Sequence, residues 1–452
     1  MRLLAITGII GSLALARQAF AAPTPPELSN SQFQQCLSGL KNSSNFSGVG
    51  STLEQYRPSE PDPSVIVSLN YQPEFQKEPW DYLSSLVDEE RVQDGIAAKR
   101  QYQDVLNRIE QRYGVKGTDV LGVWGVESNF GKQLGKKDLV QSLATLSCFD
   151  RRQSYFRSEY ANALKIIQNG DVRRDDMTGS WAGAFGQTQF MPSTFLRLAQ
   201  DFDGDGRKDL VNSQADALAS TANFLAKAGY HTGEPWGFEV KVPNGYWAAN
   251  NRRDKKPISY WRDKGFTLAN GQPLPSNLDS AGLLLPAGQN GPAFLVGKNF
   301  EAFYSYNASE NYALAIAHLS DLISQNNTNV NFATPWPTDD PGISRRQTRE
   351  IQQALINLGY DIGNADGMIG DKSRLAIQDV QRKQGVNPDG RAGLKLYHLL
   401  VANSGRAAAS SPSFRGQTTD ASPNPISSVS RPNGGIVIRR VDTGNGTDMV
   451  SP

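Results

Sequence analysis

The chain has 452 residues, with 46 lysines and arginines against 45 aspartates and glutamates, and a formal net charge of +1. This balance rules out net charge as a basis for binding nucleic acid or an anionic membrane, so recognition of any charged ligand has to be local. The length allows one large and one small domain with a sizeable core.

The first 21 residues have the features of a cleaved secretory signal peptide. Arg2 precedes an apolar run that reaches Ala16, and Ala19 and Ala21 form a typical cleavage site. The run is too short for an ordinary membrane span, no other segment could span a bilayer, and no cysteine lies at the cleavage site to carry a lipid. We therefore expect a periplasmic or secreted protein without a membrane span.

The two cysteines, Cys36 and Cys148, are expected to form one disulfide, because the protein is predicted to be exported. The alternative is two buried free thiols. Cys36 lies in a weakly helical segment, residues 29–51, and the bridge would hold this segment to the region that follows Glu127.

Helical spacing of apolar residues continues over residues 78–87 and on to Tyr113, and glycines then break the pattern at residues 114–117. The next helix begins at Thr118 and carries Glu127. Trp124, Val126 and Phe130 surround this carboxylate in the sequence. Partial burial among them would raise the pKa of Glu127 toward neutrality, which suits an acid that protonates a glycosidic oxygen. The alternative is a helix-end glutamate with no special role.

The next segments add candidate binding groups. A helical pattern over residues 139–167 is interrupted near residues 148–153, where Arg151 and Arg152 form either a solvated face or a site for a carboxylate or acetamido group. Residues 179–195 are rich in glycine and alanine, and their small side chains allow close backbone approach. The neutral donors and acceptors in this stretch, which suit sugar hydroxyls, are Ser180, Gln187 and Gln189.

Residues 201–209 resemble an EF-hand calcium loop, with aspartates at positions one, three, five and nine and Gly206 at position six. Position twelve is Asn212 rather than the usual glutamate, and Asp216 could close the site from the next helix. The alternative is a plain acidic turn. The predicted metal ligands are Asp201, Asp203, Asp205, Arg207 and Asp216.

The rest of the chain divides by composition. A helix is predicted over residues 216–228, a small β-containing insertion over residues 237–297, and a helix over residues 309–323. Tryptophans 236, 247 and 261 serve either as core or as stacking surfaces for sugars, with core as the default. Residues 326–342 have the composition of a linker, residues 343–402 form a three-helix unit with two similar Asp-Gly turns, and residues 403–452 are expected to be disordered.

Several motifs in the same order resemble the lytic murein transglycosylase B family. They are GVESNFG at residues 125–131, ATLS at 144–147, the arginine pair at 151–152, AGAFGQTQFMPS at 182–193, and the acidic loop from Asp201. The resemblance covers about residues 30–325, and the segment after the linker resembles a peptidoglycan-binding domain.

This resemblance implies a mainly α (α+β) fold, with a lysozyme-like catalytic domain at residues 30–325, a small β insertion and the helical domain at residues 343–402. It implies an enzyme that cleaves the β-1,4 bond between N-acetylmuramic acid (MurNAc) and N-acetylglucosamine (GlcNAc) and leaves a 1,6-anhydro ring. Glu127 would be the acid and then the base, in place of the usual two carboxylates. The implied substrate-binding residues are Tyr82, Arg151, Arg152, Ser180, Gln189, Phe190, Tyr306, Asn307 and Tyr312.

The expected partners are peptidoglycan glycan strands and, beyond them, other cell-wall enzymes. No cofactor is expected for the chemistry, and a calcium ion would be structural. Two rival functions are a non-catalytic peptidoglycan-binding scaffold and a lysozyme-type hydrolase.

Overall fold

The computed structural model describes residues 26–69, 77–246 and 250–402. The predicted signal peptide and the predicted tail, residues 403–452, lie outside the described residues, and so does Trp247. Within the described ranges, no helix is both long and apolar enough to cross a bilayer.

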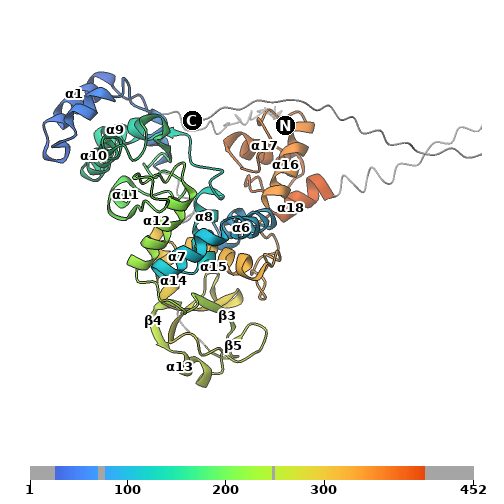
Figure 1. Ribbon diagram of the computed structural model, residues 1–452. Helices are drawn as coiled ribbons and strands as arrows, with labels where there is room; N and C mark the ends of the chain where they lie inside the picture. The colour runs from blue at the N-terminus through green and yellow to red at the C-terminus, as the bar shows by residue number, and fades with distance from the viewer. Residues whose placement is uncertain (1–25, 70–76, 247–249, 403–452) are drawn as a thin grey trace, which may run out of the picture. The chain divides into compact units, whose positions relative to one another are not determined.

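The part before residue 326 is mainly helical, as predicted, and Figure 1 shows its helices above a small sheet. The predicted break at residues 114–117 separates α7 from α8, and the predicted interruption near residues 148–153 separates α9 from α10. The helices are α1 (Asn30–Lys41), α2 (Gly50–Gln55), α3 (Pro63–Ser68), α5 (Pro79–Leu86), α6 (Glu89–Gln101), α7 (Gln103–Tyr113), α8 (Gly117–Ser128), α9 (Leu139–Phe149), α10 (Gln153–Asn169), α11 (Pro192–Leu198), α12 (Gln214–Lys227), α13 (Ile258–Asp263), α14 (Lys298–Asn307) and α15 (Glu310–Gln325).

The helices enclose two hydrophobic cores. The first core gathers apolar residues of α5 to α8, α12, α14 and α15, and the second gathers those of α1 to α3 and α9 to α11. Phe224 and Tyr306 are half-buried and pack against both cores. The boundary between the cores therefore runs past these two aromatic side chains.

The predicted β insertion is an antiparallel sheet in the order β4-β6-β7-β3-β5. Its strands are β3 (Gly237–Lys241), β4 (Asn251–Pro257), β5 (Thr267–Leu268), β6 (Ser280–Leu284) and β7 (Ala293–Val296). Two further short strands, β1 (Lys137–Asp138) and β2 (Thr178–Gly179), pair elsewhere. Trp236 and Trp261 are buried, as the default interpretation expected, and both indole nitrogens donate hydrogen bonds.

The predicted disulfide joins Cys36 of α1 to Cys148 of α9. Phe33 and Leu37, on the same helix as Cys36, are fully buried in the second core. The N-terminal helix is therefore held by packing and by a covalent bond.

The C-terminal part contains α16 (Arg345–Asn357), α17 (Asp371–Lys383), α18 (Leu394–Tyr397) and a π-helical continuation, η4 (His398–Ala402). The two predicted Asp-Gly turns are held in the same way. Gln352 donates to Asp366 at 3.0 Å and accepts from the backbone of Gly367 at 2.7 Å. Gln381 donates to Asp389 at 2.7 Å and accepts from the Gly390 amide at 2.8 Å. Because both glutamines are buried, each turn is fixed to a helix of the core.

The predicted linker, residues 326–342, packs against the part of the chain that precedes it. The Phe332 ring lies 4.2 Å from His318 and 5.0 Å from Phe294, and the amide of Thr334 donates to Glu239 at 2.7 Å. Its asparagines and prolines predict a linker, and its aromatic side chains bury apolar surface against the preceding part of the chain.

One carboxyl group of α15 predicts a pH dependence of stability. Asp321 is half-buried and accepts a hydrogen bond from the Trp236 indole at 2.9 Å. Burial raises the pKa of Asp321 to about 6. The folded protein therefore keeps a proton that the unfolded chain releases near pH 4, so its stability falls as pH rises from about 4 to 6, by on the order of 2 kcal/mol.

We expect Asp321→Asn to raise the melting temperature more at pH 7.5 than at pH 4.5, because asparagine keeps an acceptor for Trp236 without a charge. Differential scanning calorimetry at the two pH values measures this. Asp263→Asn, at an exposed position, is the control. Equal shifts at both pH values for Asp321→Asn would contradict the prediction.

Candidate active site

Glu127 is half-buried in the last turn of α8. The helix ends directly after it, because Asn129, Phe130 and Gly131 all have positive φ, at 51°, 57° and 77°. This turn folds the Phe130 ring against Trp124, edge to face at 5.5 Å between centroids. Val126, Trp124 and Phe130 are buried, so the predicted apolar setting of this helix end is confirmed.

Two glycines of α8 allow α15 to pack closely against it. A Cβ at Gly122 would lie 2.8 Å from the carbonyl oxygen of Ile316, and one at Gly125 would lie 2.7 Å from a methyl of Leu319. A side chain at Gly122 would therefore collide with the backbone of α15, and one at Gly125 would force the Leu319 and Phe130 side chains to shift. The close approach brings the first turn of α15 beside the last turn of α8.

Tyr312, in that first turn, donates a hydrogen bond from its hydroxyl to Oε1 of Glu127. Ser309 caps the helix and accepts from the Tyr312 amide at 3.4 Å, which fixes the start of α15. Burial raises the pKa of Tyr312 well above its ordinary value, and the charge of Glu127 and the nearby phenols of Tyr306 and Tyr82 add to the rise. The phenol is therefore protonated at neutral pH and acts as a donor to the carboxylate.

Tyr306 connects this pair to the glycine-rich segment. Its ring stacks on Tyr312 at 6.3 Å, and it also contacts Phe190 at 5.9 Å and Phe224 at 4.5 Å. Its hydroxyl donates to the carbonyl of Thr188 at 2.9 Å. The structure thus brings together, through a chain of contacts, Glu127, Tyr312, Tyr306 and Phe190. No local pattern in the sequence points to Phe224, which lies on the helix predicted over residues 216–228.

The glycine-rich segment forms a tight turn between Phe185 and Phe190, whose backbones exchange hydrogen bonds of 3.0 and 3.1 Å. Gln189 sits in the turn with φ of 50°, and its amide donates to two backbone carbonyls. Ser180 accepts from the Ala184 amide at 3.1 Å and is half-buried. Gln187 is buried instead, and its oxygen accepts from the Trp124 indole at 3.1 Å. Gln187 therefore supports the wall behind Glu127 and is not a free sugar ligand.

The other predicted residues lie in different settings. Tyr82 on α5 is buried, and Asn307 at the end of α14 is exposed. Arg151 and Arg152 are exposed in the turn between α9 and α10. The guanidinium of Arg152 lies 5.1 Å from the centroid of the Phe156 ring, and Phe156 belongs to the second hydrophobic core.

The predicted calcium loop brings three carboxylates together. One oxygen from each of Asp201, Asp203 and Asp205 lies within 4.8 Å of the others. The amides of Gly204 and Gly206 donate to the two oxygens of Asp201 at 2.7 and 2.9 Å, which holds the loop in shape. Three like charges at this spacing fit a hard cation with oxygen ligands.

The other two predicted ligands have protein partners. Asp216 is buried and accepts from the backbone amides of Phe202 at 2.7 Å and Asp209 at 2.9 Å. It therefore supports the loop from behind. The side chain of Arg207 donates to the carbonyl of Asp171 at 3.2 Å.

Known proteins match this chain in both of its parts. The family described as the transglycosylase SLT domain matches residues 32–321, and the peptidoglycan binding domain matches residues 344–400. Membrane-bound lytic murein transglycosylase B of Escherichia coli K12 is 32% identical over 249 residues, which are 54% of this chain and 66% of that protein.

Two solved structures are also similar. SltB3 of Pseudomonas aeruginosa in complex with NAG-anhNAM-pentapeptide is 41% identical, with a TM-score of 0.61 over 82% of this chain and 98% of that chain. The Escherichia coli lytic transglycosylase Slt35 in complex with calcium is 30% identical, with a TM-score of 0.55 over 66% of this chain and 94% of that chain. These likenesses confirm the expected lysozyme-like fold with a C-terminal helical domain.

Proposed function

This chain belongs to the transglycosylase SLT domain family, and so to the lytic murein transglycosylases, and we propose that it cleaves the β-1,4 bond between MurNAc and GlcNAc with formation of a 1,6-anhydro-MurNAc end. The observation that supports this reaction best is the half-buried carboxylate of Glu127, held by Tyr312 where α8 meets α15. The complex of SltB3 with an anhydro disaccharide bearing a pentapeptide supports it as well.

In the proposed mechanism, Glu127 first protonates the bridging oxygen as the bond from that oxygen to C1 breaks. The C6 hydroxyl of the same MurNAc then attacks C1 and gives its proton to Glu127. The net change moves one proton from O6 to the leaving oxygen, so water does not enter the product. The hydrogen bond from Tyr312 stabilises the carboxylate that forms between the two steps.

The remaining predicted site residues are proposed to bind the glycan. Phe190, which is buried, and Tyr306, which is half-buried, pack beside the Glu127–Tyr312 pair and would shape the wall of the sugar site. The amide of Gln189 and the hydroxyl of Ser180 lie in the adjoining glycine-rich segment. We propose that Tyr82 and Asn307 complete this site. Arg151 and Arg152 are proposed to contact the muropeptide from the α9–α10 turn.

Product analysis tests the reaction. Wall sacculi incubated with the purified protein should release muropeptides with anhydro ends, which a mass spectrometer separates from reducing-end products because they are lighter by one water. Reducing ends would favour a lysozyme-type hydrolase, and no release would favour a non-catalytic scaffold.

We also propose export to the periplasm, on the basis of the signal-like residues 1–21. The Escherichia coli relative is named as membrane-bound. We propose that the peptidoglycan-binding domain spans residues 343–402, binds the wall polymer and keeps the enzyme on its substrate. Association with other cell-wall enzymes is part of the same proposal.

A structural calcium ion is proposed at Asp201, Asp203 and Asp205. The converging oxygens support it, and so does the calcium complex of the related Slt35. Calcium should raise the melting temperature by roughly 2–5 °C, because an ion that binds only the folded state stabilises it. Asp203→Ala should abolish the shift, and Asp263→Ala should not. A melting temperature indifferent to calcium would argue against the site.

A further inference from the structure

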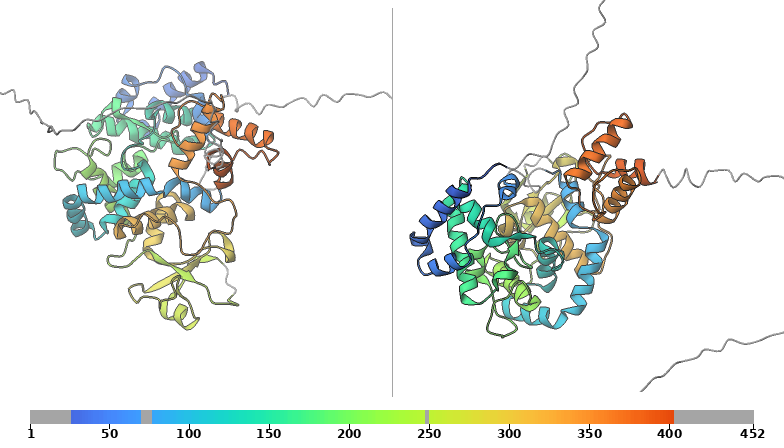
Figure 2. Two further views of the ribbon diagram at one scale, coloured as in Figure 1. Left: turned by 90° about the vertical axis from the view of Figure 1, so that its right-hand side faces the viewer. Right: turned by 90° about the horizontal axis from the view of Figure 1, so that it is seen from above.

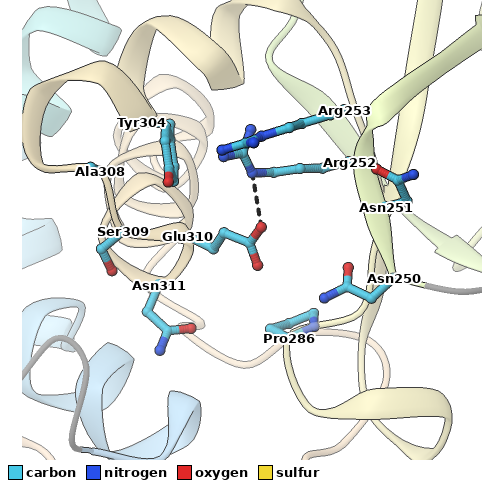
Figure 3. A pocket seen from close by; sticks show the side chains of 10 residues that line it. All are labelled: Asn250, Asn251, Arg252, Arg253, Pro286, Tyr304, Ala308, Ser309, Glu310 and Asn311. Carbon is cyan, nitrogen blue, oxygen red and sulfur yellow. Dashed lines mark hydrogen bonds and ion pairs between the residues drawn. The ribbon is translucent and has the colours of Figure 1, made fainter.

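A polar cavity of 490 Å³ lies between strand β4 and the junction of α14 with α15 (Figure 3). Figure 2 shows the sheet that supplies β4 lying below the helices. Arg252 and Arg253 enter the cavity from the strand, and Glu310 and Asn311 face it from the start of α15. Its lining is dominated by charged and amide side chains, so its ligand has to be polar.

Arg252 is a fixed part of this wall. Its side chain is 3% exposed, and it pairs with Glu301 and, at 2.9 Å, with Glu310. Its guanidinium lies 3.7 Å from the centroid of the Tyr304 ring. Lys255 also pairs with Glu301, at 3.0 Å. The two cations and two carboxylates of this network cancel, so it carries no net charge to attract a ligand.

Arg253 is the unmatched charge. Its side chain is exposed and, like that of Arg252, extends from the strand into the cavity (Figure 3). In the described part of the chain no carboxylate forms an ion pair with it, and its neighbour Asp254 pairs with Lys256 at 2.8 Å. A carboxylate bound here would pair with the Arg253 guanidinium and accept charge-assisted hydrogen bonds from it.

The cavity is close to the proposed catalytic centre. Ser309, Glu310 and Asn311 line it, and Tyr312, the next residue, donates to Glu127. Successive residues of a helix rise only about 1.5 Å along its axis, so the two sites share the first turn of α15. A group bound in the cavity can therefore belong to the same molecule as the sugar at Glu127.

We propose that the cavity binds a carboxylate of the peptide stem carried by the muramyl residue, with Arg253 as the anchoring cation. This inference rests on the proposed function. A glycan strand whose lactyl groups are amidated by peptide has no charge on its sugars, so the carboxylates of an intact substrate lie on the peptide. The cavity would thus select strands that carry stems over bare strands.

The test compares two substrates. Arg253→Ala should raise the KM for peptide-bearing glycan strands roughly tenfold with little change in kcat, because it removes one charge-assisted contact made throughout the reaction. Its KM for strands stripped of peptide by an amidase should match that of the wild type. Lys256→Ala, which removes a cation from the same strand outside the cavity, is the matched control. Arg253→Lys should recover part of the affinity for peptide-bearing strands.

The outcomes separate the hypotheses. An unchanged KM on both substrates overturns the proposal, as does an equal loss on both. A loss confined to stripped strands would show that the cavity binds the free lactyl carboxylate instead, and this too overturns it. Thermal melting shows whether each variant is folded, and Arg253→Gln replaces Arg253→Ala if the alanine variant melts early. Absence of anhydro products from the wild type would instead refute the proposed reaction.

Discussion

Glu127→Gln is expected to lower the rate of anhydromuropeptide release by roughly 10³-fold, while leaving the fold and the binding of wall polymer intact. Glutamine has nearly the same shape and keeps an oxygen that can accept from Tyr312. It cannot donate a proton to the leaving oxygen or take one from the C6 hydroxyl, so both proposed steps lose their proton carrier. General acid–base catalysis contributes about 10²–10⁴-fold for a single group, and here one group serves twice.

The measurement is the initial rate of product release from sacculi, followed by liquid chromatography and mass spectrometry. Glu89→Gln, at an exposed position in the first turn of α6, is the control and should keep the wild-type rate. Co-sedimentation with sacculi reports binding separately from turnover. Wild-type release by Glu127→Gln would refute the assignment of Glu127, whatever the products are.

The sequence could locate Glu127, but the group that holds it lies far away along the chain. Glu127 stands in a short motif that follows a predicted helix start, has two aromatic neighbours and ends in a glycine. Each of these features can be recognised locally in the sequence. Its partner Tyr312 is 185 residues away, and the contact depends on α15 packing against Gly122 and Gly125. Only the family resemblance points to Tyr312, because its bond to Glu127 is a tertiary contact that no local pattern encodes.

The roles of amide and carboxylate side chains are the hardest to predict from the sequence. Gln187 and Gln189 are two residues apart in a glycine-rich stretch, and their composition suggested the same role. The backbone turn sends Gln187 into the interior toward Trp124 and leaves Gln189 half-buried. The spacing predicts Asp216 as a ligand of the calcium loop, but its carboxylate accepts hydrogen bonds from backbone amides of that loop. In both cases a buried polar group had to be satisfied internally, and only the fold decides by which partner.

The positions of the helices can be predicted closely from the sequence. For the sheet, only the region that contains its strands can be predicted. Strand β4 has the sequence NRRDKKP, which lacks the alternation expected of a half-buried strand. It lies at an edge of the sheet, where charged residues are tolerated, and its one fully buried side chain is the paired Arg252. The cavity beside Arg253 could not be anticipated, because it needs the strand order and the position of α15.

Removing the disulfide with the double variant Cys36→Ser and Cys148→Ser is expected to cost about 4–5 kcal/mol of unfolding free energy. The bridge joins residues 112 positions apart, and closing so long a loop removes much of the entropy of the unfolded chain. The buried side chains Phe33 and Leu37 still hold α1 in the second core, so the variant should fold and keep its activity at low temperature.

Urea denaturation with circular dichroism measures this loss as a lower midpoint. Reduction of the wild type should reproduce the shift, whereas the same reductant should leave the double variant unchanged. If the double variant unfolded at the same urea midpoint as the oxidised wild type, the prediction would be contradicted. Such a result would mean that α1 separates from the domain before the rest unfolds, because a cross-link stabilises only the cooperative unit that contains both of its ends. Hydrogen exchange of α1 amides distinguishes this case, since early separation would expose them far below the midpoint.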